Sequence, residues 1–349
     1  MSYLIGTDEA GYGPNLGPLV ISASVWHVPD GLPSAELYGR LRTVVTDSAA
    51  DFPRVAIADS KALYHSGKGL RLLERGLWAA CGLLGRQPRT CAEVWDWLAP
   101  GSADDRRAAM CDGCDDAPLP GEADCDELER LRPALSQALA DAEIQLVSLE
   151  SRAVFPEEFN RTVEQCGSKG LALSRWTLGL VARAMAVLGA TAGLPSSAGS
   201  TVGQANRGAP APAGPLRHAA PVTFSVVCDK HGGRDRYGSV LTECFPDVLV
   251  EVHGEGRQRS VYRFGPPERR TEICFQARAE SHLAAALASM ASKYLRELAV
   301  RALNLFWHER LPGLRPTAGY PQDARRFKAE ITPLQRRLAI DDRVIWRAK

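Results

Sequence analysis

The sequence has almost no excess of charge of one sign, because 42 Lys and Arg residues stand against 41 Asp and Glu residues and the formal net charge is +1. The total charge therefore does not indicate a polyanionic partner, although an uneven distribution still can. Long hydrophobic runs are missing as well. The longest helical apolar stretch, 178–188, contains Arg183 and is too short to cross a bilayer. No repeat of solenoid period is visible. We expect neither a membrane protein nor a solenoid.

No apolar leader precedes the first acidic pair at position 8, and the nine cysteines are odd in number. These features favour reduced thiols and a cytoplasmic protein over a secreted, disulfide-bonded one. With 349 residues, 45% of them apolar, the chain can bury one large core or two modest ones.

Residues 2–28 carry the strongest signal. A short apolar run at 3–5 is followed by Asp8 and Glu9, then by a loop rich in Gly and Pro, then by a β-rich run at 19–28. The two carboxylates repel each other, so both stay ionised only where a cation or good donors compensate them. Alternation along a strand would point them to opposite faces, unless the strand ends here and Glu9 turns with the loop.

Two simpler interpretations of this stretch exist. One is a solvated turn with two surface acids. The other is a dinucleotide-binding fingerprint starting at Gly11, but that pattern requires a third glycine where Leu16 stands and a helix where Pro18 and a β-branched run follow. We reject the fingerprint.

The run Gly6-Thr-Asp8-Glu9-Ala-Gly11-Tyr-Gly13-Pro14-x-x-Gly17-Pro18 resembles the opening motif of type 2 ribonucleases H, which hydrolyse the RNA strand of RNA–DNA hybrids. The resemblance implies an α/β protein with an RNase H-like mixed sheet flanked by helices. On this interpretation residues 1–330 form the catalytic domain with insertions at 92–146 and 189–220, and 331–349 form a basic C-terminal tail.

A second motif, Asp59-Ser60-Lys61-Ala-Leu63, precedes a predicted helix over 68–84. Taken alone, an Asp-Ser pair before a helix is most often a cap or a turn. The family carries a similar Asp-Ser-Lys-x-Leu at this distance, and the resemblance implies that Lys61 lies near the scissile phosphate.

Asp229 ends an apolar run of buried-strand type that starts at 221. Open α/β sheets bind ligands at the carboxyl ends of their strands, so we favour Asp229 over the nearby loop acids Asp235 and Asp247 as a site residue. The family places its third acid after just such a strand.

A fourth acid, Glu280, begins the best predicted helix of the chain, 283–307. The helix dipole favours an acid there in any case. In the family register the fourth acid would fall on Ala279, so this is a departure, and we expect the longer Glu280 side chain to serve instead. His231 and His282 neighbour these ligands, and a structural role is favoured over proton shuttling.

Four other positions concern nucleic acid. Gly11 and Gly13 suit a close approach of backbone to the 2′-hydroxyls of RNA. Tyr12 stands where the family commonly has Arg, which bears on single embedded ribonucleotides. Tyr320, in a Gly-Tyr-Pro loop, matches a tyrosine that stacks on a sugar in relatives, although a plain turn has the same sequence.

Residues 92–146 fit the family poorly. Their acidic run is typical of a solvated loop, which we place away from the nucleic acid because it would repel phosphates. Cys111, Cys114 and Cys125, with Cys91 as the candidate fourth ligand, hint at zinc at incomplete spacing.

Together the motifs predict a monomeric, cytoplasmic, metal-dependent endoribonuclease that acts on RNA–DNA hybrids. Asp8, Glu9, Asp229 and Glu280 would hold two Mg²⁺ or Mn²⁺ ions, since carboxylates suit these hard cations. The alternatives are an RNase H-fold nuclease with another nucleic-acid substrate and a catalytically dead nucleic-acid-binding homologue.

Overall fold

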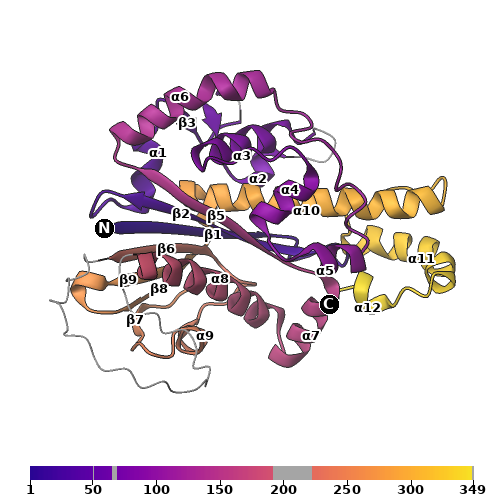
Figure 1. Cartoon of the computed structure of the whole chain (residues 1–349). Helices are drawn as coiled ribbons and strands as arrows, with labels where there is room; N and C mark the ends of the chain where they lie inside the picture. Colours follow the sequence, from indigo (N-terminus) through magenta and orange to yellow (C-terminus); the bar gives the residue numbers. More distant parts are fainter. Residues whose placement is uncertain (50, 65–68, 192–221, 348–349) are drawn as a thin grey trace, which may run out of the picture.

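The computed structural model describes residues 1–49, 51–64, 69–191 and 222–347, so most of the insertion predicted at 189–220 lies outside the described residues. Within these ranges a seven-stranded sheet runs through the molecule in the order β5-β2-β1-β6-β9-β8-β7 (Figure 1). The strands are β1 Ser2–Ala10, β2 Leu19–Val28, β5 Gln145–Val154, β6 Thr223–Asp229, β7 Glu251–Gly254, β8 Arg259–Phe264 and β9 Thr271–Gln276.

Strand direction makes this a mixed sheet. β1, β6 and β9 are adjacent and parallel, whereas β2 is antiparallel to both β1 and β5, and β7, β8 and β9 pair antiparallel. The predicted fold class, a mixed α/β sheet flanked by helices, is confirmed. The carboxyl ends of the three parallel strands meet at one edge of the sheet, which is where α/β folds place ligands.

Helices cover both faces of the sheet, because the alternating residues of its strands are apolar on both sides. Leu4 of β1 joins a buried cluster with α10 (Leu283–Arg310), α3 (Arg71–Leu83) and α6 (Cys125–Asp141). Its neighbour Ile5 joins the opposite cluster with α8 (Lys169–Thr191) and α9 (Gly238–Cys244). Figure 1 shows α10 and α8 on opposite sides of the strands.

The smaller elements connect these layers. Helix α1 (Leu37–Arg40) is a single turn, and Val45 soon afterwards pairs with Val55 in a parallel two-stranded sheet. The remaining elements are η1 Ser34–Glu36, α1 Leu37–Arg40, β3 Val45–Thr46, β4 Val55–Ala56, α2 Ser60–Leu63, α4 Cys91–Leu98, α5 Ala103–Ala108, α7 Pro156–Cys166, η2 Pro267–Arg269, η3 Ala279–Ser281, α11 Pro321–Arg337 and α12 Asp342–Ile345.

The prediction of a solvated loop over the acidic run is only partly right, because residues 109–124 form a loop but the acids on either side lie in helices. Residues 92–146 carry most of α4, all of α5 and all of α6, and Trp95 is fully buried. The buried carboxylate of Glu74 on α3 anchors this region, accepting hydrogen bonds from the backbone N–H groups of residues 121–123 at 2.6–3.0 Å. The periodic apolar residues between the acids pack on α3 and α10, and the acids occupy the outer turns.

Helix α8 contains the apolar stretch 178–188 and begins nine residues before it, at Lys169. By length and composition its segment Lys169–Gly189 could cross a membrane, and 56% of that apolar window is buried inside the protein. Core helices pass the same test, and α8 packs on the sheet through Leu173, Leu180 and Val181.

Gly6 sets how closely β1 packs on α10. A Cβ atom at this position would collide with the backbone of Ala284 and Ala285 and lie 2.7 Å from the Ala284 side chain. We predict that Gly6→Ala lowers the free energy of unfolding by about 3 kcal/mol, since neither backbone can move without disturbing the core. Urea denaturation measures this cost. Gly39→Ala is the matched control, because Gly39 is exposed on α1 with no atom within 4 Å of the added methyl; a similar loss there would contradict the packing argument.

Candidate active site

The strand register brings Asp8 and Asp229 together. β1 and β6 are parallel and pair up to Thr7 and Cys228, so the two carboxylates follow at the same level on neighbouring strands. Neighbouring strands are about 4.8 Å apart. Both side chains lie on the α10 face: Asp8 is in the alternation set of Leu4, and Asp229 is in that of Val227, which packs on Ala279 and Ala285. Folding therefore unites acids that are 221 positions apart in the sequence.

Glu280 follows β9, the third of the parallel strands. After β9 the chain turns through Arg278, a non-glycine residue in the left-handed conformation at φ 62°, into the short helix η3. Ala279, where the resemblance would place an acid, is fully buried against Val227, and its N–H lies 3.5 Å from a carboxylate oxygen of Asp229. Glu280 is half-buried and interacts electrostatically with Asp229.

Glu9 differs from the other three acids. The prediction allowed for a strand that ends near Asp8, but β1 continues to Ala10 and Glu9 still pairs with Ile21. The pleat therefore assigns Glu9 to the face opposite Asp8. The Glu9 carboxylate remains in electrostatic contact with Asp8 and Asp229.

The pKa values of all four carboxylates are raised, mainly by burial. Burial, then the charges of Asp229 and Glu280, raise the pKa of Asp8 to about 7, against an opposing hydrogen bond with Ser289. The pKa of Glu9 lies well above its ordinary value, through burial and then the charge of Asp8. Burial is also the main cause of the raised pKa values of Asp229 and Glu280. Such a cluster of mutually repelling, partly desolvated acids is the electrostatic environment that a cation relieves.

Lys61 supplies one positive charge to this cluster. Burial lowers the pKa of its ammonium, but the charges of Asp59, Asp8 and Glu280 outweigh that effect and raise it overall. The Asp59 carboxylate accepts a hydrogen bond from the Lys61 backbone N–H at 3.0 Å, so the predicted cap at the start of α2 is present. The Lys61 side chain itself is exposed. Lys61 is in electrostatic contact with Asp8, Glu280 and Asp229.

No ready-made ligand cage is present: among the described residues, no three His, Cys, Asp or Glu side chains are gathered closely enough to hold a metal ion. The alternation that separates Glu9 from Asp8 is one reason. The proposed zinc set is not assembled either. Cys91 and Cys111 are buried with Cys114 as an electrostatic neighbour, whereas Cys125 is exposed at the start of α6.

Comparison with known proteins gives similarity at the level of solved structures. No family model matches the chain, and no curated protein sequence does. The ribonuclease H2 of Pyrococcus horikoshii OT3 is 15% identical, with 98% of this chain and 92% of that chain covered and a TM-score of 0.39. The RNase HII in the PCNA complex from Archaeoglobus fulgidus is 12% identical, with 99% and 94% covered and a TM-score of 0.36. The Bst-RNase HIII in complex with Mn²⁺ is 13% identical, with 99% and 66% covered and a TM-score of 0.35. At these values the case for function rests on the site itself.

The glycine loop, residues 11–17, lies beside the acids. Gly11 has a φ of +92°, and a Cβ there would lie 2.7 Å from the Arg296 side chain and from the Pro18 carbonyl oxygen. Tyr320, 55% exposed, is the nearest neighbour of Gly13. Tyr12 is half-buried, and its hydroxyl occupies space that a side chain at Gly232 would fill. The loop thus places Gly13 and Tyr320 at the surface and turns Tyr12 towards the protein.

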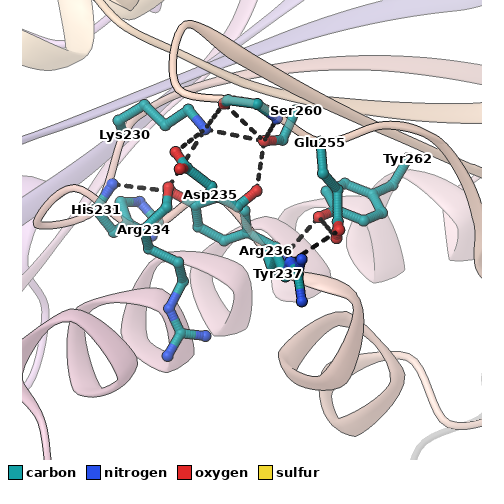
Figure 2. A network of polar contacts seen from close by, with 10 residues as sticks. Lys230, His231, Arg234, Asp235, Arg236, Tyr237, Glu255, Ser260 and Tyr262 are labelled. Atoms are coloured by element: carbon teal, nitrogen blue, oxygen red, sulfur yellow. Dashed lines mark hydrogen bonds and ion pairs between the residues drawn. The ribbon is translucent and has the colours of Figure 1, made fainter.

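Lys230 follows Asp229 directly but does not join the acids. Its ammonium donates to the Gly256 carbonyl at 2.7 Å and to Ser260 Oγ at 2.9 Å, and lies 3.4 Å from Asp235. Figure 2 shows this network spanning the loop after β6 and the β7–β8 hairpin, with Tyr262 and Glu255 continuing it. Lys230 therefore anchors the loop that follows Asp229.

His231 is a structural residue. It is buried, its ring packs edge-on against Tyr237 and Phe275, and Nδ1 lies 3.0 Å from Ser174 Oγ. Burial, then the charges of Arg234 and Lys230, lower its pKa to about 3. The imidazole is neutral at physiological pH, so the structural interpretation is favoured over a proton shuttle. His282 contacts Ser34 and Gln276 instead of the acids.

Sequence reasoning missed the serines of α10. Ser289 bonds to Asp8 and to Ser60, while Ser292 Oγ donates to the Asp8 carbonyl oxygen at 3.0 Å and to Ser22 Oγ at 2.8 Å. Both serines are buried. Their spacing of three residues on the predicted buried face of a helix was the available signal, since polar side chains there require partners.

Proposed function

We propose that this protein is a metal-dependent endoribonuclease that hydrolyses the RNA strand of RNA–DNA hybrids. The observation that carries the proposal is that Asp8 and Asp229 follow neighbouring parallel strands at the same level, with Glu280 and Lys61 in electrostatic contact with them. A structural cluster of surface acids would be solvated and would not keep an Asp with a pKa near 7.

The donor set fits Mg²⁺ or Mn²⁺, because all four side chains are carboxylates, and burial is the main cause of their raised pKa values. Asp8, Glu9, Asp229 and Glu280 would hold the ions, with Glu9 contributing from the end of β1, where its carboxylate is in electrostatic contact with Asp8 and Asp229. When bound, the ions supply a nucleophilic water and relieve the charge of the leaving 3′ oxygen.

The protein's own residues have separate tasks. Lys61 is the exposed cation next to the acids and would hold the scissile phosphate. Gly11 and Gly13 allow a ribose to approach the backbone, and Tyr320 offers an exposed ring beside Gly13 for stacking. Ser289 orients the Asp8 carboxylate through its hydroxyl.

A nuclease with another nucleic-acid substrate is the second candidate, favoured by one observation. Tyr12 packs towards Gly170 and Gly232. The side chain between the two loop glycines is therefore held against the protein, whereas a long basic side chain would be free to contact nucleic acid. Recognition of the 2′-hydroxyl then depends on the backbone and on Tyr320.

One assay separates the possibilities. The purified chain is incubated with an RNA–DNA hybrid, the matching all-DNA duplex and a branched DNA, each with Mg²⁺, with Mn²⁺ and with chelator. We expect cleavage of the RNA strand of the hybrid, with either ion and not with chelator. Cleavage of DNA in preference to the hybrid supports the second candidate, and no metal-dependent cleavage of any substrate supports a nucleic-acid-binding homologue without activity.

A further inference from the structure

Segments that are distant in the sequence hold the glycine loop in place, and the proposed mechanism does not use these contacts. Arg296 of α10 lies against Gly11, and Gly319 turns against Leu16 so closely that a Cβ there would lie 2.9 Å from the Leu16 carbonyl oxygen. The Asn15 N–H donates to the Gly319 carbonyl at 2.8 Å. The remaining side of the loop contacts the C-terminal residues Trp346 and Arg347.

Arg347 is bound to the loop at several points. Its backbone N–H donates to the Asn15 carbonyl at 2.9 Å, and the Asn15 side chain returns a hydrogen bond to the Arg347 carbonyl at 3.2 Å. Its guanidinium donates to the Pro14 carbonyl. Leu16 and Trp346 form an isolated antiparallel bridge. The last described residue of the chain therefore pairs with the loop as a short strand would.

Arg347 is not a surface phosphate contact. It is 3% exposed, and its guanidinium lies 4.8 Å from the Phe159 ring centroid. Its Nε and Nη1 atoms have no hydrogen-bond partner among the described residues, and neither does Nε of Arg296. Burial, with the nearby charge of Arg296, lowers the pKa of Arg347 to about 9.

Burying a guanidinium with unsatisfied donors is costly, so an arginine at this position requires a compensating role. Arg343, four residues earlier in the first turn of α12, is an ordinary tail arginine whose side chain is exposed to solvent. The difference between the two lies in the contacts of Arg347 with Pro14 and Asn15.

We propose that Arg347 is a positioning residue that fixes the conformation of the glycine loop from behind. Its effect on nucleic-acid recognition rests on the function proposed above, because the loop carries Gly11, Gly13 and the neighbour contact to Tyr320. The C-terminal residues are then part of the site scaffold and not a separate basic tail.

Hydrogen exchange of the free protein tests the positioning directly. The amide of Asn15 is protected by the Gly319 carbonyl and not by Arg347, so it reports whether the loop stays in place. In Arg347→Met we expect exchange in residues 11–17 to be at least tenfold faster, with β1 and α10 unchanged. Arg347→Lys, which keeps the stem and the charge but not the planar fork, should give an intermediate rate and covers the case that the methionine variant does not fold. Arg343→Met is the matched control and should leave the loop unchanged.

Binding measures the consequence. In an Asp8→Asn background, which prevents cleavage, Arg347→Met should reduce the preference for an RNA–DNA hybrid over the matching DNA duplex about tenfold. The salt dependence of binding should not change, since a phosphate contact is not removed. Unchanged loop exchange in both Arg347 variants, or a salt slope reduced by about one, would overturn the positioning role. A parent protein without preference for the hybrid would instead refute the proposed function, and the exchange result would still decide the role of Arg347.

Discussion

Asp8→Asn should abolish metal-dependent cleavage of an RNA–DNA hybrid, with a loss of about a thousandfold or more in rate. Asp8 interacts electrostatically with both Asp229 and Glu280, and an amide removes its charge at nearly the same volume. Loss of several kcal/mol of transition-state stabilisation corresponds to this factor. Single-turnover cleavage with Mg²⁺ and with Mn²⁺ measures it, and hybrid binding should persist.

Asp247→Asn is the control for this experiment. Asp247 is an exposed loop carboxylate that follows Asp229 in the sequence but lies on no strand end of the site. We expect its rate to remain within twofold of the parent. Equal losses in both variants, or an active Asp8→Asn protein, would show that the carboxylates at the sheet edge do not carry the reaction.

The second large effect concerns stability without metal. The pKa of Asp8 in the folded protein is about 7, above its ordinary value of 3.8. A raised pKa means that the folded state binds the proton more tightly than the unfolded chain, so stability falls as pH rises from about 4 towards 7. Between pH 5 and pH 8 the loss attributable to Asp8 is about 2–3 kcal/mol. The raised pKa values of Glu9, Asp229 and Glu280 act in the same direction.

Urea denaturation of the chelator-treated parent protein and of the Asp8→Asn variant, each at pH 5 and at pH 8, isolates the contribution of Asp8 to stability. The variant should gain stability relative to the parent on going from pH 5 to pH 8. Mg²⁺ or Mn²⁺ should stabilise the parent at pH 8 more than at pH 5, because carboxylate ligands bind metal in their deprotonated form. A stability difference between the two proteins that does not vary with pH would contradict the electrostatic account of the site.

These expectations depend on rigid neighbours as much as on the acids. Lys230 anchors the loop after Asp229 through Ser260 and Asp235 (Figure 2). The strand before Asp8 packs closely on α10 at Gly6. A carboxylate cluster with raised pKa values persists only where such surroundings prevent the side chains from moving apart.

The sequence by itself determined the strands, the main helices and the acids. β2 and α8 lie where alternation, β-branching and helical spacing predicted them, and Asp229 ends its strand as expected. These signals are local, because each depends on residues within a few positions of one another. The acidic run around α6 misled for the same reason: its charge was visible, but the surface that its apolar residues cover belongs to α3 and α10.

Only the tertiary structure decided how the site is arranged. The parallel register of β1 and β6 unites Asp8 with Asp229, and the buried Ala279 makes Glu280 the acid that faces them. Burial likewise separates Arg347 from the exposed Arg343, although the sequence presents both as basic residues of one tail. Strand register and side-chain burial depend on contacts between segments that lie hundreds of residues apart in the sequence. A local pattern of residues therefore cannot predict them.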